Sequence, residues 1–233
     1  MKTEKIEYIN SRSWHKVIKG RIINIPARIS KYYSRKNQYS LLRNALPEFA
    51  HGNIISIGYG GEISKVLDGE NIKYTSIDIT GSPDVLCDVQ DMRVFKEESV
   101  DTIICMSVLA EVENPIKAVS EFKRILKPNG FIICSTAFIL PQYQEQDLYR
   151  FTKSGVRYLF RDFKEIQLNE RSTYLESALV ILLRTVNIGT RNEKIAGIVL
   201  LPFYLLLAML TVIGNVIIRN KTSTTAYFSI WEK

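Results

Sequence analysis

The sequence has few of the residues that build metal and disulfide sites. It holds two histidines and three cysteines in 233 residues, and Cys87, Cys105 and Cys134 lie far apart, with no Cys-x-x-Cys pair and no histidine near them. This spacing does not provide a zinc ligand set, and an odd number of cysteines does not pair into a disulfide framework. We therefore expect no metal site and three buried thiols in a reducing compartment.

The sequence also lacks an uninterrupted apolar run of signal-peptide length near its start, which argues against secretion. Residues 1–44 hold eleven Lys and Arg against two Glu, a net charge of +9, whereas the remaining residues sum to −2. Aromatic and isoleucine side chains lie between these charges, so the segment suits an anionic membrane surface, with a solvated helix as the alternative. Nucleic acid is a less favoured partner because no binding motif accompanies the charge, and nothing in the sequence indicates the oligomeric state.

Charge is absent from residues 195–218, a run of 24 positions that Lys194 precedes and Arg219 and Lys221 follow. The run is longer than the roughly 20 residues that cross a bilayer core. Pro202 and two glycines weaken a straight span, however. We expect a membrane-associating helical segment here, and a buried core helix is the alternative.

The middle of the chain alternates short apolar runs with helical patterns, which is typical of a parallel α/β sheet. We expect a Rossmann-like α/β fold with a mostly parallel sheet and helices on both faces. The predicted strands are 54–57, 74–77, 102–106, 130–135 and 166–168, and the predicted helices are 115–126, with a Lys-Pro-Asn-Gly stop at 127–130, and 152–160, which Thr152 can cap.

A nucleotide-type site is predicted where the first two strands end. Gly58, Gly60 and Gly61 follow the first strand, where glycines let the backbone approach a ligand at a helix N-terminus. Asp78 ends the second strand 20 residues after Gly58, a position from which a carboxylate can accept hydrogen bonds from both ribose hydroxyls. The alternative for Asp78 is a turn aspartate. Asp88 follows the next strand, where adenine would lie, and a nicotinamide cofactor would fit the same pattern.

With these residues in place, residues 53–171 resemble the class I S-adenosylmethionine-dependent methyltransferases. The segments that carry the resemblance, in order, are the glycine turn at 58–61, Ile-Asp-Ile at 77–79, Asp-Val-Leu-Cys-Asp at 84–88, Val-Asp-Thr-Ile-Ile-Cys at 100–105, Val-Leu-Ala-Glu-Val-Glu-Asn-Pro at 108–115, Arg-Ile-Leu-Lys-Pro-Asn-Gly at 124–130 and Asp-Leu-Tyr-Arg-Phe-Thr at 147–152. The resemblance implies S-adenosylmethionine as cofactor. It also implies these roles: Gly58, Tyr59 and Gly60 around the methionine part, Asp78 and Ile79 at the ribose, Asp88 and Val89 at the adenine, and Ser107 near the sulfonium.

A general base is needed only where the acceptor ionises poorly, as a sugar hydroxyl does. The candidates are Glu111, Asp147 and Tyr149. Each has a structural alternative, because Glu111 can cap a helix, Asp147 can pair with Arg150, and Tyr149 can pack in the core.

The end of the chain bears on membrane attachment. Residues 225–231 are rich in strand-forming side chains and suit the antiparallel last strand of the family. Residues 174–221 would then form an insertion that leaves and returns on one side of a membrane, which excludes an odd number of crossings. Within it, residues 175–186 are interrupted by Glu176 and Arg184 and suit an interfacial helix. We expect a monotopic or re-entrant anchor on the cytoplasmic side, although a single pass is the alternative if the last strand does not rejoin the sheet.

Together these features predict a basic segment (1–44), a methyltransferase domain (45–173), a hydrophobic insertion (174–221) and a last strand (222–233). The predicted activity is methyl transfer to a small or lipid-linked acceptor, with the sugar hydroxyl of a glycolipid or polyprenyl-linked glycan favoured and membrane lipids as partners. The alternative is a non-catalytic, membrane-associated scaffold, because the chain has Ser56 where the family usually has an acid and lacks the histidines that the family often has where Glu111 stands and shortly before residues 147–150. The family also usually has a third glycine where Glu62 stands.

Overall fold

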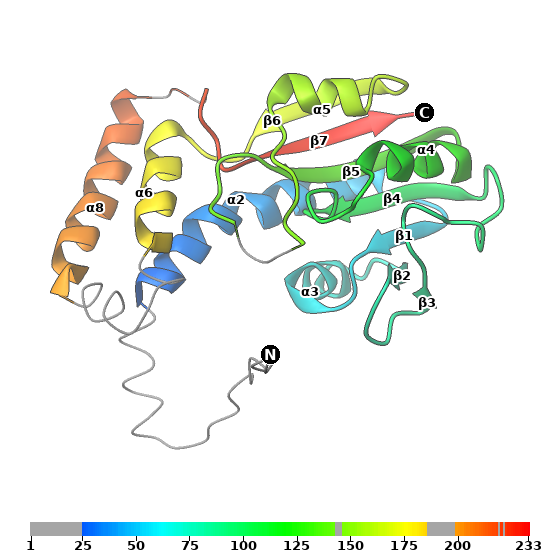
Figure 1. Cartoon of the computed structure of the whole chain (residues 1–233), viewed down its shortest axis with the longest axis horizontal. Helices are drawn as coiled ribbons and strands as arrows, with labels where there is room; N and C mark the ends of the chain where they lie inside the picture. The colour runs from blue at the N-terminus through cyan, green and yellow to red at the C-terminus, as the bar shows by residue number, and fades with distance from the viewer. Residues whose placement is uncertain (1–24, 143–145, 186–198, 219, 221) are drawn as a thin grey trace, which may run out of the picture.

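The computed structural model describes residues 25–142, 146–185, 199–218, 220 and 222–233. They form a seven-stranded sheet in the order β3-β2-β1-β4-β5-β7-β6, with helices packed around it (Figure 1). The strands are β1 (Ile54–Ile57), β2 (Thr75–Asp78), β3 (Val85–Leu86), β4 (Val100–Met106), β5 (Leu126–Ala137), β6 (Lys164–Glu170) and β7 (Ala226–Glu232). The helices are α2 (Ile25–Phe49), α3 (Gly61–Gly69), α4 (Pro115–Ile125), α5 (Lys153–Leu159), α6 (Tyr174–Thr185) and α8 (Leu201–Ile217).

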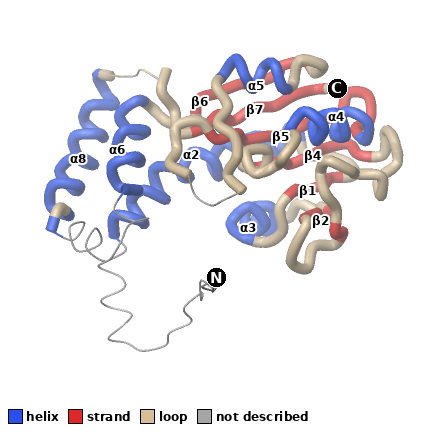
Figure 2. The backbone as a smooth tube through the Cα atoms, viewed as in Figure 1, coloured by secondary structure: helices blue, strands red, loops and turns tan. Residues whose placement is uncertain are grey.

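The sheet is parallel from β3 to β5, and β7 pairs antiparallel with both β5 and β6. The predicted mostly parallel sheet with an antiparallel last strand is confirmed. Six of the seven β7 residues are buried, so this strand belongs to the core rather than to an edge. The chain therefore returns from the hydrophobic insertion to a position inside the sheet, between β5 and the edge strand β6 (Figure 2).

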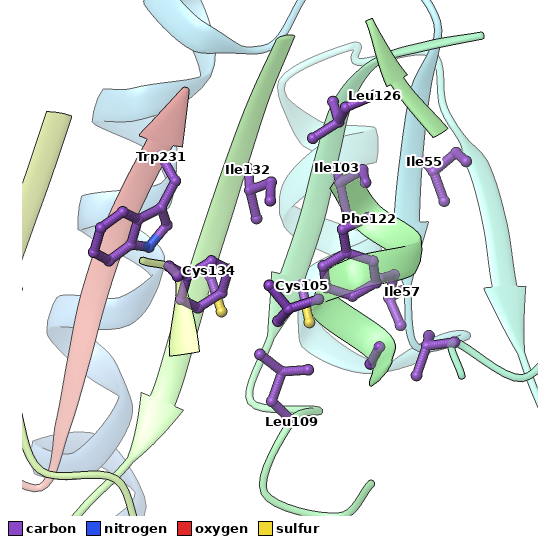
Figure 3. Close-up of a cluster of buried hydrophobic side chains, with 14 of the residues drawn as sticks. Ile55, Ile57, Ile103, Cys105, Leu109, Phe122, Leu126, Ile132, Cys134 and Trp231 are labelled. Carbon is purple, nitrogen blue, oxygen red and sulfur yellow. The ribbon is translucent and has the colours of Figure 1, made fainter. Parts of the chain in front are cut away.

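The core lies on both faces of the sheet because successive side chains of a strand point to opposite sides. Ile55 and Ile57 face a cluster that includes Phe122 of α4, whereas Ile54 faces a second cluster under α2 and α3 (Figure 3). At the far side of the first cluster, Trp231 stacks on Phe160 with ring centroids 4.9 Å apart. Helices on both faces were predicted, and this prediction is confirmed.

Two predicted helices occur close to their expected positions. The Asn114 side chain accepts a hydrogen bond from the Lys117 amide and begins α4, and the Thr152 side chain caps α5 as expected. The helix predicted over 115–126 ends one residue early because Leu126 already pairs with Val100 of β4. The predicted turn at 127–130 consequently lies within β5, where it produces an irregular register.

The basic segment predicted over 1–44 does not end at residue 44, because α2 continues through that position to Phe49. Leu42, Ala45 and Leu46 are buried against the sheet, and Tyr33, earlier in α2, packs with the insertion helices. These positions recur at helical spacing among charged residues, so α2 is part of the folded domain. Residues 1–24 lie outside the described chain.

The helices α2, α6 and α8 form a three-helix cluster at one end of the sheet (Figure 1). Its interior contains Tyr33 of α2, Leu179, Val180 and Leu183 of α6, and Tyr204 of α8. The charge-free run predicted over 195–218 corresponds to α8, with residues 195–198 outside the described chain. No helix in the described part of the chain combines the length and the apolar character that crossing a bilayer requires.

Candidate active site

Three adjoining cavities lie at the carboxyl ends of the parallel strands, where ligands bind in open α/β sheets. A wide cavity of about 570 Å³ lies beside Asp78, Asp88 and Val89. A glycine-turn cavity of about 240 Å³ lies beside Gly58, Tyr59 and Gly60 and shares Gly58 and Asp78 with the wide cavity. An inner cavity of about 110 Å³ shares Ser107 with the glycine-turn cavity and Glu111 with the wide one.

The glycine turn after β1 has a backbone that other residues adopt at a cost. Gly58, Gly60 and Gly61 have φ angles of 98°, 74° and 74°, in the left-handed region. A Cβ atom built on Gly60 or Gly61 would meet no atom within 4 Å, so the turn faces open space. The turn leads directly into α3, whose first residues, Gly61 to Ile63, line the glycine-turn cavity.

The Asp78 carboxylate orders this turn from the end of β2. One oxygen accepts a hydrogen bond from the Tyr59 amide at 2.8 Å, and the other accepts one from the Thr80 amide at 3.1 Å. The Gly58 amide donates to the carbonyl oxygen of Ile77, so the start of the turn is also bonded to β2. Asp78 therefore acts as the predicted turn aspartate and also lines both ligand cavities, so the two interpretations are compatible.

Asp88 and its neighbours form the opposite wall of the wide cavity. The Asp88 carboxylate accepts a hydrogen bond from the Gln90 amide at 2.8 Å, and the Gln90 side chain accepts one from the Asn114 amide. Val89 is buried, whereas Ile79 is exposed at the cavity mouth. An apolar wall next to a carboxylate is the kind of surface on which a purine ring can lie.

Tyr59 and Glu62 line the glycine-turn cavity, and a volume of about 240 Å³ remains open between its lining residues. The Tyr59 ring lies over Gly81, within 3.2 Å of where a Cβ atom would be. The Glu62 carboxylate pairs with Lys65 on the exposed surface of α3. The buried Ser56 hydroxyl, at the position of the family acid, has no hydrogen-bond partner among the described residues. The space beside the turn is therefore open to a ligand.

Ser107 lies directly after β4 with a φ angle of 66°, an uncommon backbone for a residue other than glycine. Its amide donates to the carbonyl oxygen of Ser135 on β5, which fixes the bend. The residue lines both the glycine-turn cavity and the inner cavity. Ser107 is thus at the boundary between the glycine-turn cavity and the inner cavity.

The predicted bases fall in different places. Glu111 lines the wide and inner cavities, and Asp147 lines the inner cavity. Both oxygens of Asp147 accept hydrogen bonds from the Arg150 guanidinium, and this ion pair raises the pKa of Arg150. Asp147 is therefore occupied by its arginine, the structural alternative that the sequence left open.

Tyr149 is not brought to the cavities. Its hydroxyl donates to the carbonyl oxygen of Glu113 at 2.7 Å, and its ring stacks on Phe151. The amides of Leu148 and Tyr149 both donate to the carbonyl oxygen of Ala110, which ties this loop to the one carrying Glu111. The residue positions the loop, and its prediction as a base is not supported by this geometry.

Several lining residues escape prediction from sequence. Arg35 and Gln38 of α2 line the glycine-turn and inner cavities, and Arg171 lines the inner cavity. The apolar residues of α2 give only a weak helical pattern, because Ser30, Ser34 and Gln38 are also buried in it. Arg171 follows a charged strand end and gives no such signal. Among the described residues, no group of His, Cys, Asp and Glu side chains could hold a metal ion.

Comparison with known proteins agrees with this arrangement. Residues 55–134, from β1 into β5, match the methyltransferase domain family. The human thiol S-methyltransferase TMT1B is 37% identical over 43 residues, which span 18% of this chain and 18% of that protein.

Solved structures share the fold over most of the chain. A S-adenosylmethionine-dependent methyltransferase from Archaeoglobus fulgidus superposes with a TM-score of 0.54 at 12% identity, covering 95% of this chain and 100% of that one. The [4+2]-cyclase SpnF superposes with a TM-score of 0.57 at 12% identity, covering 84% of this chain and 80% of that one. The second likeness shows that this fold hosts more than one reaction. The matched residues include the glycine turn, Asp78, Asp88 and Ser107, so the match to the methyltransferase domain family covers the predicted cofactor site.

Proposed function

We propose that this protein binds S-adenosylmethionine and transfers its methyl group to a lipid-linked acceptor at a membrane surface. The continuity of the three cavities carries the proposal. The wide cavity, with Asp78 and Asp88, suits adenosine, and the glycine-turn cavity suits the methionine part. The inner cavity then lies past Ser107, where the acceptor must approach the methyl group.

The residues of the turn fit such a cofactor. The positive φ angles and the open space beside Gly60 and Gly61 let the backbone approach a ligand closely. Asp78 is held by two amides, so it meets a ribose without reorganising. When bound, S-adenosylmethionine supplies an electrophilic methyl group on a positive sulfur, which leaves as a neutral thioether.

For methyl transfer, the protein must also bind the acceptor and accept the proton that the acceptor hydroxyl loses. Glu111 faces both the wide and the inner cavity, so it can accept a proton from a hydroxyl held between them. Asp147 instead forms an ion pair with Arg150 in the lining of the inner cavity. Glu111 is therefore our candidate general base for a sugar hydroxyl.

Attachment to a membrane is proposed from the surface of α8. Phe203, Leu206, Leu210, Ile213 and Ile217 recur at three- and four-residue spacing, and each is about half exposed or more. Water disfavours so long an uncharged apolar stripe, whereas the interface of a bilayer favours it.

The charges and cysteines of the chain support a cytoplasmic membrane surface. Basic residues at 194, 219 and 221 flank the α8 run, and residues 1–44 carry a net +9, which suits anionic lipid headgroups. The three cysteines are buried and unpaired, which suits a reducing compartment. We therefore propose the cytoplasmic face of the membrane.

Calorimetry with S-adenosylhomocysteine tests the cofactor site. We expect Asp78→Ala to weaken binding about 10- to 100-fold, because a charge-assisted hydrogen bond contributes about 1.5–3 kcal/mol. The control is Asp68→Ala, which removes an exposed carboxylate from α3 and should leave the affinity unchanged. No heat from the wild-type protein at high ligand concentration would instead support the non-catalytic scaffold, for which the buried serine at position 56 is the specific observation.

The acceptor class is tested by incubating the protein with labelled S-adenosylmethionine and a total membrane extract. Label recovered in the organic-solvent phase supports a lipid-linked acceptor. Label confined to water-soluble metabolites would contradict it while leaving methyl transfer intact.

A further inference from the structure

A buried arginine without a carboxylate partner lies in the wall of the inner cavity. Arg171 is only 5% exposed. One terminal nitrogen donates to the Ser135 hydroxyl at 3.0 Å, and the other donates to the carbonyl oxygen of Ser34 on α2. Its Nε atom has no hydrogen-bond partner among the described residues, and no carboxylate in this part of the chain pairs with it.

The surroundings leave this charge uncompensated. Burial, and to a smaller extent the positive charge of nearby Arg35, together lower the pKa of Arg171 to about 9. A buried charge is costly unless an opposite charge or strong hydrogen bonds replace its water. Two neutral oxygens are weaker partners than one anion would be, so the site is better suited to a bound anion than to none.

The cavity that Arg171 lines has the size and the charge for a small oxyanion. It measures about 110 Å³, compared with the roughly 30 Å³ that one water molecule occupies in the liquid. Arg35 lines the same cavity from α2. The Arg150–Asp147 ion pair contributes no net charge to the cavity. The other charged residues in its described lining are Arg35, Arg171 and Glu111, which together carry one excess positive charge.

We propose that Arg171 and Arg35 bind a phosphate group of the methyl acceptor. The inference rests on the proposed function, because the inner cavity is the acceptor space only if the cofactor lies beside Ser107. A guanidinium group recognises phosphate through several directed hydrogen bonds. A sugar linked to a prenol carries its phosphate between the sugar and the apolar chain, so this group is the natural anchor of a lipid-linked acceptor.

The position of the cavity agrees with a lipid phosphate. Leu140 lines the inner cavity and also packs against the three-helix cluster of α2, α6 and α8. A phosphate held by Arg171 would therefore lie between the apolar helices and the reacting end of the acceptor. Leu140 therefore connects the three-helix cluster, the proposed membrane-facing part, with the proposed acceptor cavity.

Calorimetric titration with inorganic phosphate, on the full chain saturated with S-adenosylhomocysteine, tests the proposal. Saturation fills the site for the cofactor carboxylate, so the heat reports only a second anion site. We expect phosphate to bind the wild-type protein and to bind Arg171→Gln and Arg35→Gln at least about tenfold more weakly. Arg157→Gln removes an arginine of the exposed Arg157–Glu165 pair and is the matched control, with unchanged affinity.

The outcomes separate the inference from the proposed function. Phosphate binding that Arg35→Gln does not weaken overturns the inference even where Arg171→Gln fails to fold, because Arg35 is only half-buried. Absence of phosphate binding beside normal S-adenosylhomocysteine binding also overturns it and leaves the proposed function standing. Absence of S-adenosylhomocysteine binding defeats the proposed function itself.

Competition with two phosphate esters identifies the source of the group. Dodecyl phosphate represents a lipid phosphate, and glucose 1-phosphate represents a soluble sugar phosphate. Displacement of inorganic phosphate by either ester supports the inference, and the tighter ester identifies the source. Equal displacement by dodecanol or by glucose, which lack the anion, overturns it.

Discussion

At the scale of single residues, the acids of the site organise the backbone before any ligand arrives. Asp78 accepts hydrogen bonds from the amides of Tyr59 and Thr80, and Asp88 accepts one from the amide of Gln90. Each carboxylate is thus held in place by its own loop. A preorganised acceptor loses less entropy when a ribose or an adenine binds, so the local bonds and the proposed binding role reinforce each other.

Gly60→Ala tests whether the turn needs glycine for its backbone and for its open side. The backbone of Gly60, with φ 74° and ψ −159°, is one that almost only glycine adopts, so an alanine there costs about 1–3 kcal/mol of folding stability, and the new methyl group would enter the space beside the turn. We expect lower stability in urea denaturation and weaker S-adenosylhomocysteine binding in calorimetry. Gly69→Ala is the control, because that residue has no positive φ and a Cβ atom there also meets open space. Equal behaviour of the two variants would contradict this role of the turn.

The residues at this scale were predictable to different degrees. All eight predicted cofactor residues line the wide or the glycine-turn cavity, because strand ends of a parallel sheet meet at one edge and sequence order alone places them there. The Ser34–Arg171 contact joins residues 137 positions apart and depends on how α2 packs. No local pattern reports such a contact, so the side of the inner cavity formed by α2 and Arg171 could not be predicted, whereas Ser107, Glu111 and Asp147 on its other side were predicted site residues.

At the scale of elements, an ion pair within α4 binds the loop that precedes β4. The Glu121 carboxylate pairs with Arg124 and accepts a hydrogen bond from the Met92 amide at 2.8 Å. Arg124 in turn donates to the carbonyl oxygens of Met92 and Phe95. These bonds hold the segment between β3 and β4, so the wall carrying Asp88 depends on α4.

Glu121→Gln should lower the free energy of unfolding by about 1.5–3 kcal/mol at neutral pH, since it removes charged hydrogen bonds. The bond from Arg124 lowers the pKa of Glu121 below its ordinary value of 4.5. The stabilisation is therefore complete above pH 4.5 and is lost as the pH falls through the lowered pKa of the folded state. Urea denaturation of both proteins at several pH values measures this, and a difference that persists unchanged in acid would contradict it.

The element that sequence reasoning placed least well is α2. Its charges indicated a surface segment, whereas Leu42 and Leu46 are fully buried or nearly so against the sheet. Charge and burial coexist because a helix turns about 100° per residue, so one face can stay in water while the other packs. The buried positions of α2 also include Ser30, Ser34 and Gln38, so neither the net charge nor the apolar pattern of this helix indicated its place in the fold.

At the scale of the whole molecule, the hydrophobic insertion is an excursion between two neighbouring strands. It leaves after β6 and returns to β7, and its ends meet where the Tyr174 amide donates to the carbonyl oxygen of Asn220 at 2.9 Å. Hydroxyl groups of Ser172, Thr224 and Thr225 bond to one another at the same point. The two ends of the insertion are therefore bonded to each other where it leaves and rejoins the sheet. The exposed side chains of α6 and α8 can then contact another surface without changing the pairing of β6 and β7 (Figure 1).

This arrangement predicts that membrane attachment can be removed without unfolding the enzyme. The double variant Leu206→Glu and Ile213→Glu places two charges on the exposed stripe of α8, where the side chains are 46% and 54% exposed. We expect stability within about 0.5 kcal/mol of wild type, because exposed positions tolerate substitution, and a loss of flotation with vesicles of phosphatidylcholine and phosphatidylglycerol, because charge opposes apolar insertion. Val94→Glu with Ile116→Glu adds the same charge at exposed apolar positions elsewhere and should leave flotation intact. If both double variants float equally well, α8 is not the attachment surface.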